Sequence, residues 1–138
     1  MSSQLTVEIG GLQLSNPTML AAGILGLSGA SLREAIRNGA GAVVTKSVGL
    51  KPHIGYANPS VVHVNCGLLN AIGLANPGAQ DYAKEIRELK EDGLNVPLIT
   101  SVFGFSSEEF AKVARILTGA GADGIELNVS CPHVEKTG

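Results

Sequence analysis

The sequence contains no tryptophan and only five aromatic residues, two Tyr and three Phe, among 138 residues. It also lacks an excess of positive charge, because 10 basic residues stand against 12 acidic ones and the net charge is −2. Nucleic-acid binding favours a clustered basic face, so this composition argues against it. No apolar run approaches the roughly 20 residues that a membrane-spanning helix needs. The two cysteines, Cys66 and Cys131, are too few to form a disulfide or metal framework on their own.

The first residues also lack the basic and apolar regions of a secretory signal peptide. Hydrophobic residues make up 44% of the chain, which excludes a disordered protein. A length of 138 residues suffices for one ordinary domain and not for two large ones. We therefore expect a soluble, cytoplasmic protein.

The hydrophobic pattern predicts a parallel α/β fold that follows a short hairpin. Residues 5–14 alternate apolar and polar around Gly10 and Gly11, as in a β-hairpin with a two-residue glycine turn. After this hairpin, strand-like apolar segments alternate with segments of helical period, which is typical of parallel α/β proteins. The predicted strands cover residues 18–23, 42–47, 97–102 and 124–130, and the predicted helices cover about 31–38, 79–91 and a segment after Ser106.

Local signals refine these elements. Ser31 with Glu34, and Ser106 with Glu109, have the S-x-x-E spacing of a capping box and predict two helix starts. The strands over 18–23 and 42–47 have the continuous apolar character of buried parallel strands. The connection over residues 49–78 has no sustained helical period, so we expect a long loop, and such loops inside compact domains are usually functional.

Two parallel architectures fit this pattern, an open sheet and a (β/α) barrel. No G-x-G-x-x-G follows the first strand of the parallel pattern, which argues against a dinucleotide-binding sheet. In both architectures the active site lies at the carboxyl ends of the strands. The polar or reactive residues at those ends are Lys46, Ser47, Ser101, Asn128, Ser130 and Cys131.

Two segments are suited to ligand binding. A lysine in a buried strand, such as Lys46, must find an anionic partner or lose its proton. It either caps the sheet and reaches solvent, or holds an anion or an electron-rich ring. The segment 65–78 combines glycines, which permit close backbone approach, with asparagines, whose amides suit an amide- or uracil-like ring. Its alternative interpretation is a run of turns with Asx caps.

Cys131 follows the last predicted strand and precedes Pro132, which fixes the turn. A thiol in such a loop can transfer a proton if its pKa is tuned. The alternative is a small buried hydrophobic residue. Cys66 has no comparable setting and is expected to be structural. His53 and His63 lie in the long loop without metal-ligand spacing, so we expect them to form hydrogen bonds there and expect no metal site.

Three ordered motifs resemble those of the dihydroorotate dehydrogenase family. They are Thr-Lys-Ser at 45–47, Asn-Ala-Ile-Gly-Leu-Ala-Asn-Pro-Gly at 70–78 and Glu-Leu-Asn-Val-Ser-Cys-Pro at 126–132. The cysteine of the last motif points to class 1, and the Asn-Ala-Ile-Gly-Leu stretch looks most like the NAD-linked type B catalytic subunit. The resemblance covers essentially the whole chain. It implies an FMN-containing (β/α)8 barrel that oxidises (S)-dihydroorotate to orotate in pyrimidine synthesis.

The resemblance also implies roles for individual residues. Cys131 would be the base that removes the C5 proton, while a hydride passes from C6 to the flavin. Lys46 would lie near the flavin and the substrate carboxylate, where its charge stabilises the electron-rich reduced flavin. The other residues implied to bind substrate are Asn70, Ile72, Gly73, Leu74 and Asn128. Those implied to bind the cofactor are Ala21, Ala22, Gly23, Lys46, Ser47, Ser101 and Asn128.

Two positions depart from the family's pattern. His133 stands where the family usually has asparagine. The pyrimidine-reducing domain of dihydropyrimidine dehydrogenase has Ser-Cys-Pro-His at this place, so a related uracil-type substrate is one alternative. Ala22 stands where the family often has serine, which removes one hydroxyl contact.

The resemblance further implies that residues 1–138 are the N-terminal half of a single FMN-binding barrel domain. The family's later strands supply a second lysine, another substrate asparagine and the phosphate-binding loops. A truncation or a break in the chain would explain the length. The implied partner is an electron-transfer subunit with FAD and an iron–sulfur cluster, in a homodimer or heterotetramer. The second alternative is a non-catalytic half-barrel module that binds a ligand at its strand ends.

Overall fold

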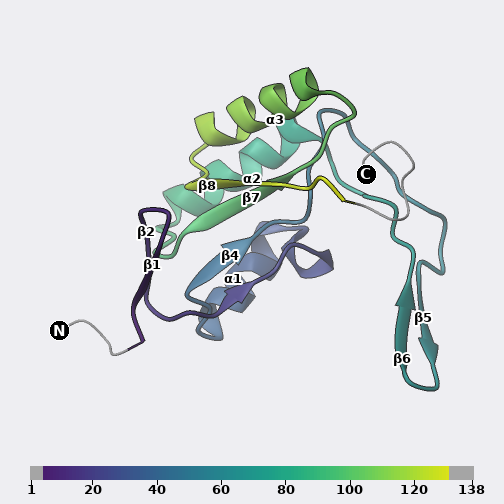
Figure 1. Cartoon of the computed structure of the whole chain (residues 1–138), viewed down its shortest axis with the longest axis horizontal. Coiled ribbons are helices and arrows are strands. Elements are labelled where there is room, and N and C mark those ends of the chain that lie inside the picture. Colours follow the sequence, from purple (N-terminus) through teal and green to yellow (C-terminus); the bar gives the residue numbers. More distant parts are fainter. Residues whose placement is uncertain (1–4, 131–138) are drawn as a thin grey trace.

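Four parallel strands form the central sheet of the protein, seen in a computed structural model that describes residues 5–130 (Figure 1). The strands pair in the order β3-β4-β7-β8, and each pair is parallel. Their bounds are Met19–Leu20 for β3, Ala42–Val44 for β4, Leu98–Val102 for β7 and Gly124–Leu127 for β8. The predicted parallel sheet is therefore confirmed: β7 ends at Val102 as predicted, and β3, β4 and β8 each end three residues earlier than predicted.

Three α-helices within the described residues cover one face of this sheet. They are α1 (Gly29–Arg37), α2 (Ala79–Glu91) and α3 (Ser107–Gly119), and a short 3-10 helix, η1 (Ile24–Gly26), precedes α1. Neighbouring helices pack on each other and share one hydrophobic core with the sheet. Tyr82, Ile86 and Leu89 of α2 lie in that core, as the predicted stripe requires. Burial of this stripe supplies the main driving force for the helix to dock.

The strand order bears on the choice between the two predicted architectures. The order β3-β4-β7-β8 follows the chain without reversal. A doubly wound sheet reverses its strand order at a switch point, whereas a (β/α) barrel adds each strand beside the previous one. The described strands therefore favour a segment of a barrel, although they do not close on one another.

The predicted N-terminal hairpin is confirmed and lies at the amino end of the sheet. Strands β1 (Val7–Ile9) and β2 (Leu12–Leu14) pair antiparallel around a two-residue turn. Gly10 and Gly11 have φ values of 57° and 83°, which only glycine adopts without strain. Leu14 is buried, and Leu12 packs beside the first residue of β8. The hairpin thus covers the end of the sheet opposite the predicted site.

The start of α1 differs from the prediction. Ser28 is the N-cap and forms a capping box with Ser31, so the predicted box of Ser31 and Glu34 is wrong. The helix therefore begins earlier than predicted, and a tertiary contact also satisfies its first turn: the Glu85 carboxylate of α2 accepts a hydrogen bond from the Gly29 N–H at 2.8 Å. A local pattern cannot show a partner that lies 56 residues away.

The other two helix predictions fare better. Helix α2 has the predicted bounds. At α3, the Ser106 hydroxyl accepts a hydrogen bond from the Glu109 N–H, as predicted. The Glu109 carboxylate, however, accepts from the Phe105 N–H rather than from the cap residue itself.

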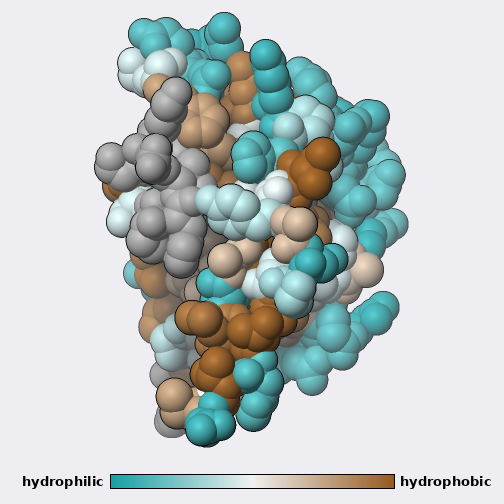
Figure 2. Space-filling model, turned by 90° about the vertical axis from the view of Figure 1, so that its right-hand side faces the viewer, coloured by the Kyte–Doolittle hydropathy of each residue, from teal (hydrophilic) through white to brown (hydrophobic). Residues whose placement is uncertain are grey.

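Two strand predictions need correction. The segment 18–23 was expected to be a buried strand, yet β3 has only two residues, and Met19 is exposed because β3 lies at an edge of the described sheet. The connection 49–78 was expected to be a loop, yet it contains an antiparallel hairpin of β5 (Val61–Val64) and β6 (Gly67–Asn70). The three valines of β5 favour a strand, and backbone hydrogen bonds pair β5 with β6 although the side chains of both strands are exposed. Hydrophobic residues gather at the lower end of Figure 2, where Figure 1 places this hairpin.

No helix within residues 5–130 is both long and apolar enough to cross a membrane.

Two buried threonines lead to a stability prediction. Thr100 is fully buried on β7, and its hydroxyl has no hydrogen-bond partner among the described residues. Thr45 is equally buried, but its hydroxyl accepts from the Ser101 N–H at 3.1 Å and donates to the Lys46 carbonyl at 2.9 Å. An unsatisfied buried hydroxyl costs free energy, whereas a satisfied one stabilises.

We expect Thr100→Val to raise the free energy of unfolding by about 1 kcal/mol and Thr45→Val to lower it by about 2 kcal/mol. Urea denaturation of both variants measures these changes. The two substitutions remove the same atoms, so the pair controls for size and shape. A loss of stability of similar size in both variants would contradict the assignment of Thr100 as unsatisfied.

Candidate active site

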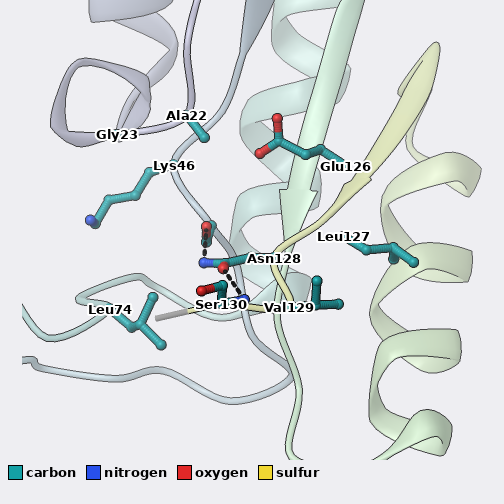
Figure 3. A pocket seen from close by; sticks show the side chains of 10 residues that line it. Ala22, Gly23, Lys46, Leu74, Glu126, Leu127, Asn128, Val129 and Ser130 are labelled. Carbon is teal, nitrogen blue, oxygen red and sulfur yellow. Dashed lines mark hydrogen bonds between the residues drawn. The ribbon is translucent and has the colours of Figure 1, made fainter. Parts of the chain in front are cut away.

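A pocket of about 410 Å³ opens at the carboxyl ends of the parallel strands (Figure 3). Its walls come from the segments that directly follow β3, β4 and β8, and from the loop before α2. The lining residues are Ala22, Gly23, Lys46, Ser47, Leu74, Glu126, Leu127, Asn128, Val129 and Ser130. This is the edge at which parallel α/β proteins carry their active sites.

The wall that follows β3 is built from small residues. Ala22 and Gly23 line the pocket, and among residues 5–130 no atom outside the chain neighbours of Gly23 lies within 4 Å of the place that a Cβ on Gly23 would take. Gly26, three residues after Gly23, approaches the end of β4 so closely that a Cβ on Gly26 would lie 2.5 Å from the backbone nitrogen of Lys46. Small residues thus leave the pocket open, and Gly26 lets the two segments touch.

Lys46 is 8% exposed and lines the pocket just beyond β4. Its N–H donates to the Gly26 carbonyl at 2.8 Å, which joins the β4 segment to the β3 segment. Glu126 of β8 also lines the pocket, and Figure 3 shows its carboxylate on the opposite side from the Lys46 ammonium. The pocket therefore carries positive and negative charge at separate places.

A chain of three polar side chains crosses the sheet beneath the pocket. The Asn128 amide donates to the Ser47 hydroxyl at 3.0 Å, and the Ser47 and Ser101 hydroxyls lie 2.9 Å apart. The Ser130 N–H donates to the amide oxygen of Asn128 at 3.3 Å, which turns the amide nitrogen toward Ser47 (Figure 3). The ends of β4, β7 and β8 are thereby held together by side chains as well as by backbone.

The loop before α2 supplies Leu74, whose backbone is in the left-handed region with φ 54°. This conformation is costly for a residue with a side chain. Asn76, which is buried, stabilises it: its amide donates to the Leu74 carbonyl at 2.8 Å and its oxygen accepts from the Gly49 and Gly78 N–H groups. Asn76 therefore has the Asx-capping role that was the alternative interpretation of this segment.

The structure brings together many of the residues predicted for the site. Lys46, Ser47, Leu74 and Asn128 share the pocket with Ala22 and Gly23, and Ser101 joins them through Ser47. The described walls do not include Ala21, Asn70, Ile72 or Gly73. Asn70 is exposed at the end of β6, and the Ile72 carbonyl accepts from the Tyr56 N–H. Cys131 and His133 lie outside the described residues.

Sequence reasoning missed Glu126 as a lining residue. All five residues from Glu126 to Ser130 line the pocket. Glu126 belongs to the same Glu-Leu-Asn-Val-Ser-Cys-Pro motif as Asn128, so that motif carried the signal for it. Within residues 5–130 no group of three or more His, Cys, Asp or Glu side chains could hold a metal ion.

The arrangement suits a flat, partly polar ligand. Ala22 and Gly23 can accept the face of a ring, and Ser47 and Asn128 offer hydrogen bonds to polar ring edges. Lys46 adds a positive charge that favours an anionic or electron-rich group. A volume of about 410 Å³ lies within the usual range of small-molecule sites.

Comparisons of this sequence with a family model and with curated proteins point to the same family. A family model described as dihydroorotate dehydrogenase matches residues 4–138. A protein of Methanocella arvoryzae named dihydroorotate dehydrogenase B (NAD(+)), catalytic subunit, is 50% identical over 98% of this chain and 44% of its own length. A protein of the same name from Methanosarcina acetivorans is 53% identical over 93% of this chain and 41% of its own length. Another, from Pyrococcus abyssi, is 46% identical over 97% of this chain and 44% of its own length. The chain thus spans less than half the length of these curated relatives.

The hydroxyl pair beneath the pocket leads to a prediction of coupling. Ser101 is fully buried and bonds to Ser47, so Ser47→Ala and Ser101→Ala should each lower the free energy of unfolding by about 1–2 kcal/mol. The double variant should lose about 1 kcal/mol less than the sum, because the second substitution removes a group that is already without its partner. Denaturant unfolding of the four proteins measures the cycle.

Ser106→Ala provides the control, since Ser106 caps α3 and shares no hydrogen bond with Ser101. Its effect should add to that of Ser101→Ala. Strict additivity of Ser47→Ala and Ser101→Ala would show that the two hydroxyls do not interact in solution.

Proposed function

Since the chain belongs to the dihydroorotate dehydrogenase family, we propose that the protein oxidises (S)-dihydroorotate to orotate in pyrimidine synthesis, with FMN as its cofactor. The observation that carries this proposal is the pocket at the carboxyl edge of the sheet. There, Lys46 and Ser47, which follow β4, lie beside Asn128, which follows β8. These residues belong to the two motifs that the family resemblance places at the cofactor and the substrate.

The proposed architecture is a closed (β/α)8 barrel, of which residues 1–138 form the N-terminal half. The unreversed strand order and the helices on one face support it. Strands β3 and β8 each have one neighbour among the described residues, so each offers an edge to a further parallel strand. Closure removes such edges.

The residues present fit a flavin. Gly23 leaves open space where a side chain would otherwise stand, and Ala22 beside it is small. This wall can hold the face of the isoalloxazine ring, while Ser47, Asn128 and, through Ser47, Ser101 supply hydrogen bonds at its edge. When bound, FMN supplies a hydride acceptor.

Lys46 is the cation that the proposal places at the pocket. The residue is mostly buried, so water screens a charge there weakly. A fixed cation favours the state in which negative charge has developed on the neighbouring ring, and it also attracts the carboxylate of dihydroorotate. Asn128 is oriented by the Ser130 N–H and by Ser47 before any ligand arrives, which reduces the cost of binding.

The proposed oxidation removes a proton from C5 and a hydride from C6 of dihydroorotate, and a C5–C6 double bond forms. Cys131 is the proposed base that takes the C5 proton. It directly follows Ser130, which lines the pocket. Leu74 lines the pocket too. We assign Asn70, Ile72 and Gly73 to the binding of substrate with Leu74, and Ala21 to the binding of the cofactor with Ala22 and Gly23.

The names of the relatives bear on partners. Each is called a catalytic subunit, which implies a partner subunit in those enzymes. For this protein the proposal includes an electron-transfer subunit with FAD and an iron–sulfur cluster, assembly as a homodimer or heterotetramer, and a cytoplasmic location.

The proposed function predicts a spectral change. The protein expressed from its complete gene should show a flavin absorbance that bleaches without oxygen when dihydroorotate is added. Dihydrouracil tests the related pyrimidine oxidoreductase, for which dihydrouracil and not dihydroorotate would bleach the flavin, and uracil would reoxidise the reduced flavin. A folded protein that binds no flavin would instead support the non-catalytic binding module.

The proposed base predicts a kinetic effect. Cys131→Ser should slow flavin reduction at neutral pH by at least about 100-fold, because a hydroxyl is a poorer base than a tuned thiol. Anaerobic stopped-flow absorbance measures the rate. Cys66→Ser is the matched control, since Cys66 is exposed in the turn of the β5–β6 hairpin, and its rate should equal that of the parent. A Cys131→Ser rate equal to the control would remove Cys131 from the reaction.

A further inference from the structure

Tyr82 has a buried hydroxyl that the proposed chemistry does not use. The residue lies in the first turns of α2, has no exposed surface, and packs in the core between helices and sheet. Its hydroxyl donates to the Gly26 carbonyl at 2.6 Å, across 56 residues of sequence. Burial raises the pKa of the Tyr82 phenol well above its ordinary value, so the group remains a neutral donor.

The same carbonyl accepts a second hydrogen bond that reaches the pocket. The Lys46 N–H donates to the Gly26 oxygen at 2.8 Å, so one carbonyl joins α2, the segment after β3 and the segment after β4. The approach is too close for any side chain at position 26. Both pocket walls on this side, Ala22–Gly23 and Lys46, therefore depend on where the Gly26 carbonyl lies.

Helix α2 holds this segment at a second point. Glu85, three residues after Tyr82, accepts the Gly29 N–H through its carboxylate at 2.8 Å. Residues three apart lie on the same face of a helix. One face of α2 thus bonds to both Gly26, the last residue of η1, and Gly29, the first residue of α1. Both glycines closely follow the pocket wall in the sequence.

We infer that Tyr82 is a positioning residue of the candidate active site: through the Gly26 carbonyl, its hydroxyl fixes the Lys46 backbone and the Ala22–Gly23 wall in the arrangement that binds the ligand. The inference rests on the proposed function, in which this wall and Lys46 face the flavin. Loss of the hydroxyl leaves the ring in the core but leaves Gly26 with one donor instead of two. The segment then gains freedom that ligand binding must remove.

The test compares Tyr82→Phe with Thr100→Val in the protein expressed from its complete gene. Each variant removes one buried oxygen from the same sheet-and-helix core, but the Thr100 hydroxyl bonds to nothing in the described residues. We expect Tyr82→Phe to weaken FMN binding about tenfold, measured by flavin fluorescence, and to speed exchange of the Lys46 amide hydrogen about tenfold. The reduction potential of the bound flavin should become more negative, because the Lys46 charge is held less closely. Thr100→Val should change none of these.

A role in stability alone would lower the unfolding midpoint of Tyr82→Phe and leave FMN affinity, flavin potential and Lys46 exchange unchanged, and that result would overturn the inference. If Tyr82→Phe does not fold, Glu85→Ala takes its place, because it removes the other bond from α2 to this segment. Glu85→Gln, which keeps an acceptor oxygen, should restore the parent values. Equal FMN affinity in Glu85→Ala and Glu85→Gln would contradict the inference.

The exchange measurement separates this inference from the proposed function. A parent protein that binds no FMN would refute the proposed cofactor, yet faster exchange at Lys46 in Tyr82→Phe alone would still support the positioning contact. A parent that binds FMN and is reduced by dihydroorotate, with a Tyr82→Phe variant that matches it in every readout, would refute the positioning role only.

Discussion

Parallel pairing in chain order brings the carboxyl ends of β3, β4, β7 and β8 to one edge of the sheet. Each crossover must return over the same face to begin the next strand, which places α1, α2 and α3 side by side on that face. The segments that follow these strands carry polar side chains, and they line the pocket. The candidate site exists because of this one topological constraint.

The polar edge has to be stabilised, since hydroxyls and amides removed from water cost free energy unless they are paired. Ser101 has no exposed surface, and its pairing with Ser47 offsets that cost. Thr100, its neighbour in sequence, is equally buried and has no partner among the described residues. The two adjacent hydroxyls show the difference between a polar group built into a network and one that the fold merely tolerates.

The parts of the fold that could be predicted from sequence are those decided by local periodicity. Helix α2 has a clean apolar stripe and was predicted with its observed bounds. The start of α1 was not, because the chain forms its capping box with Ser28 and Ser31, and the Glu85 carboxylate of another helix also bonds to the first turn. The β5–β6 hairpin was missed because its residues are all exposed, and without burial on one face no alternating apolar pattern identifies the strands.

The candidate site shows the same division. Residues that directly follow strands, such as Lys46 and Asn128, could be placed together because parallel strands share an edge. Asn70 could not be placed, since it ends a hairpin whose position depends on the tertiary structure. Leu74 entered the prediction through family resemblance alone, and no local pattern indicated its left-handed backbone.

The left-handed backbone of Leu74 also affects the pocket wall. A glycine at position 74 would adopt φ 54° without strain, and the chain does use glycine at the neighbouring positive φ of Gly73. A leucine there costs on the order of 1 kcal/mol, and the three hydrogen bonds of the Asn76 side chain offset it. The Leu74 side chain is 8% exposed and forms part of the pocket wall. Leucine at this position therefore gives the pocket an apolar surface at the cost of backbone strain, and the Asn76 side chain bonds the loop that carries it.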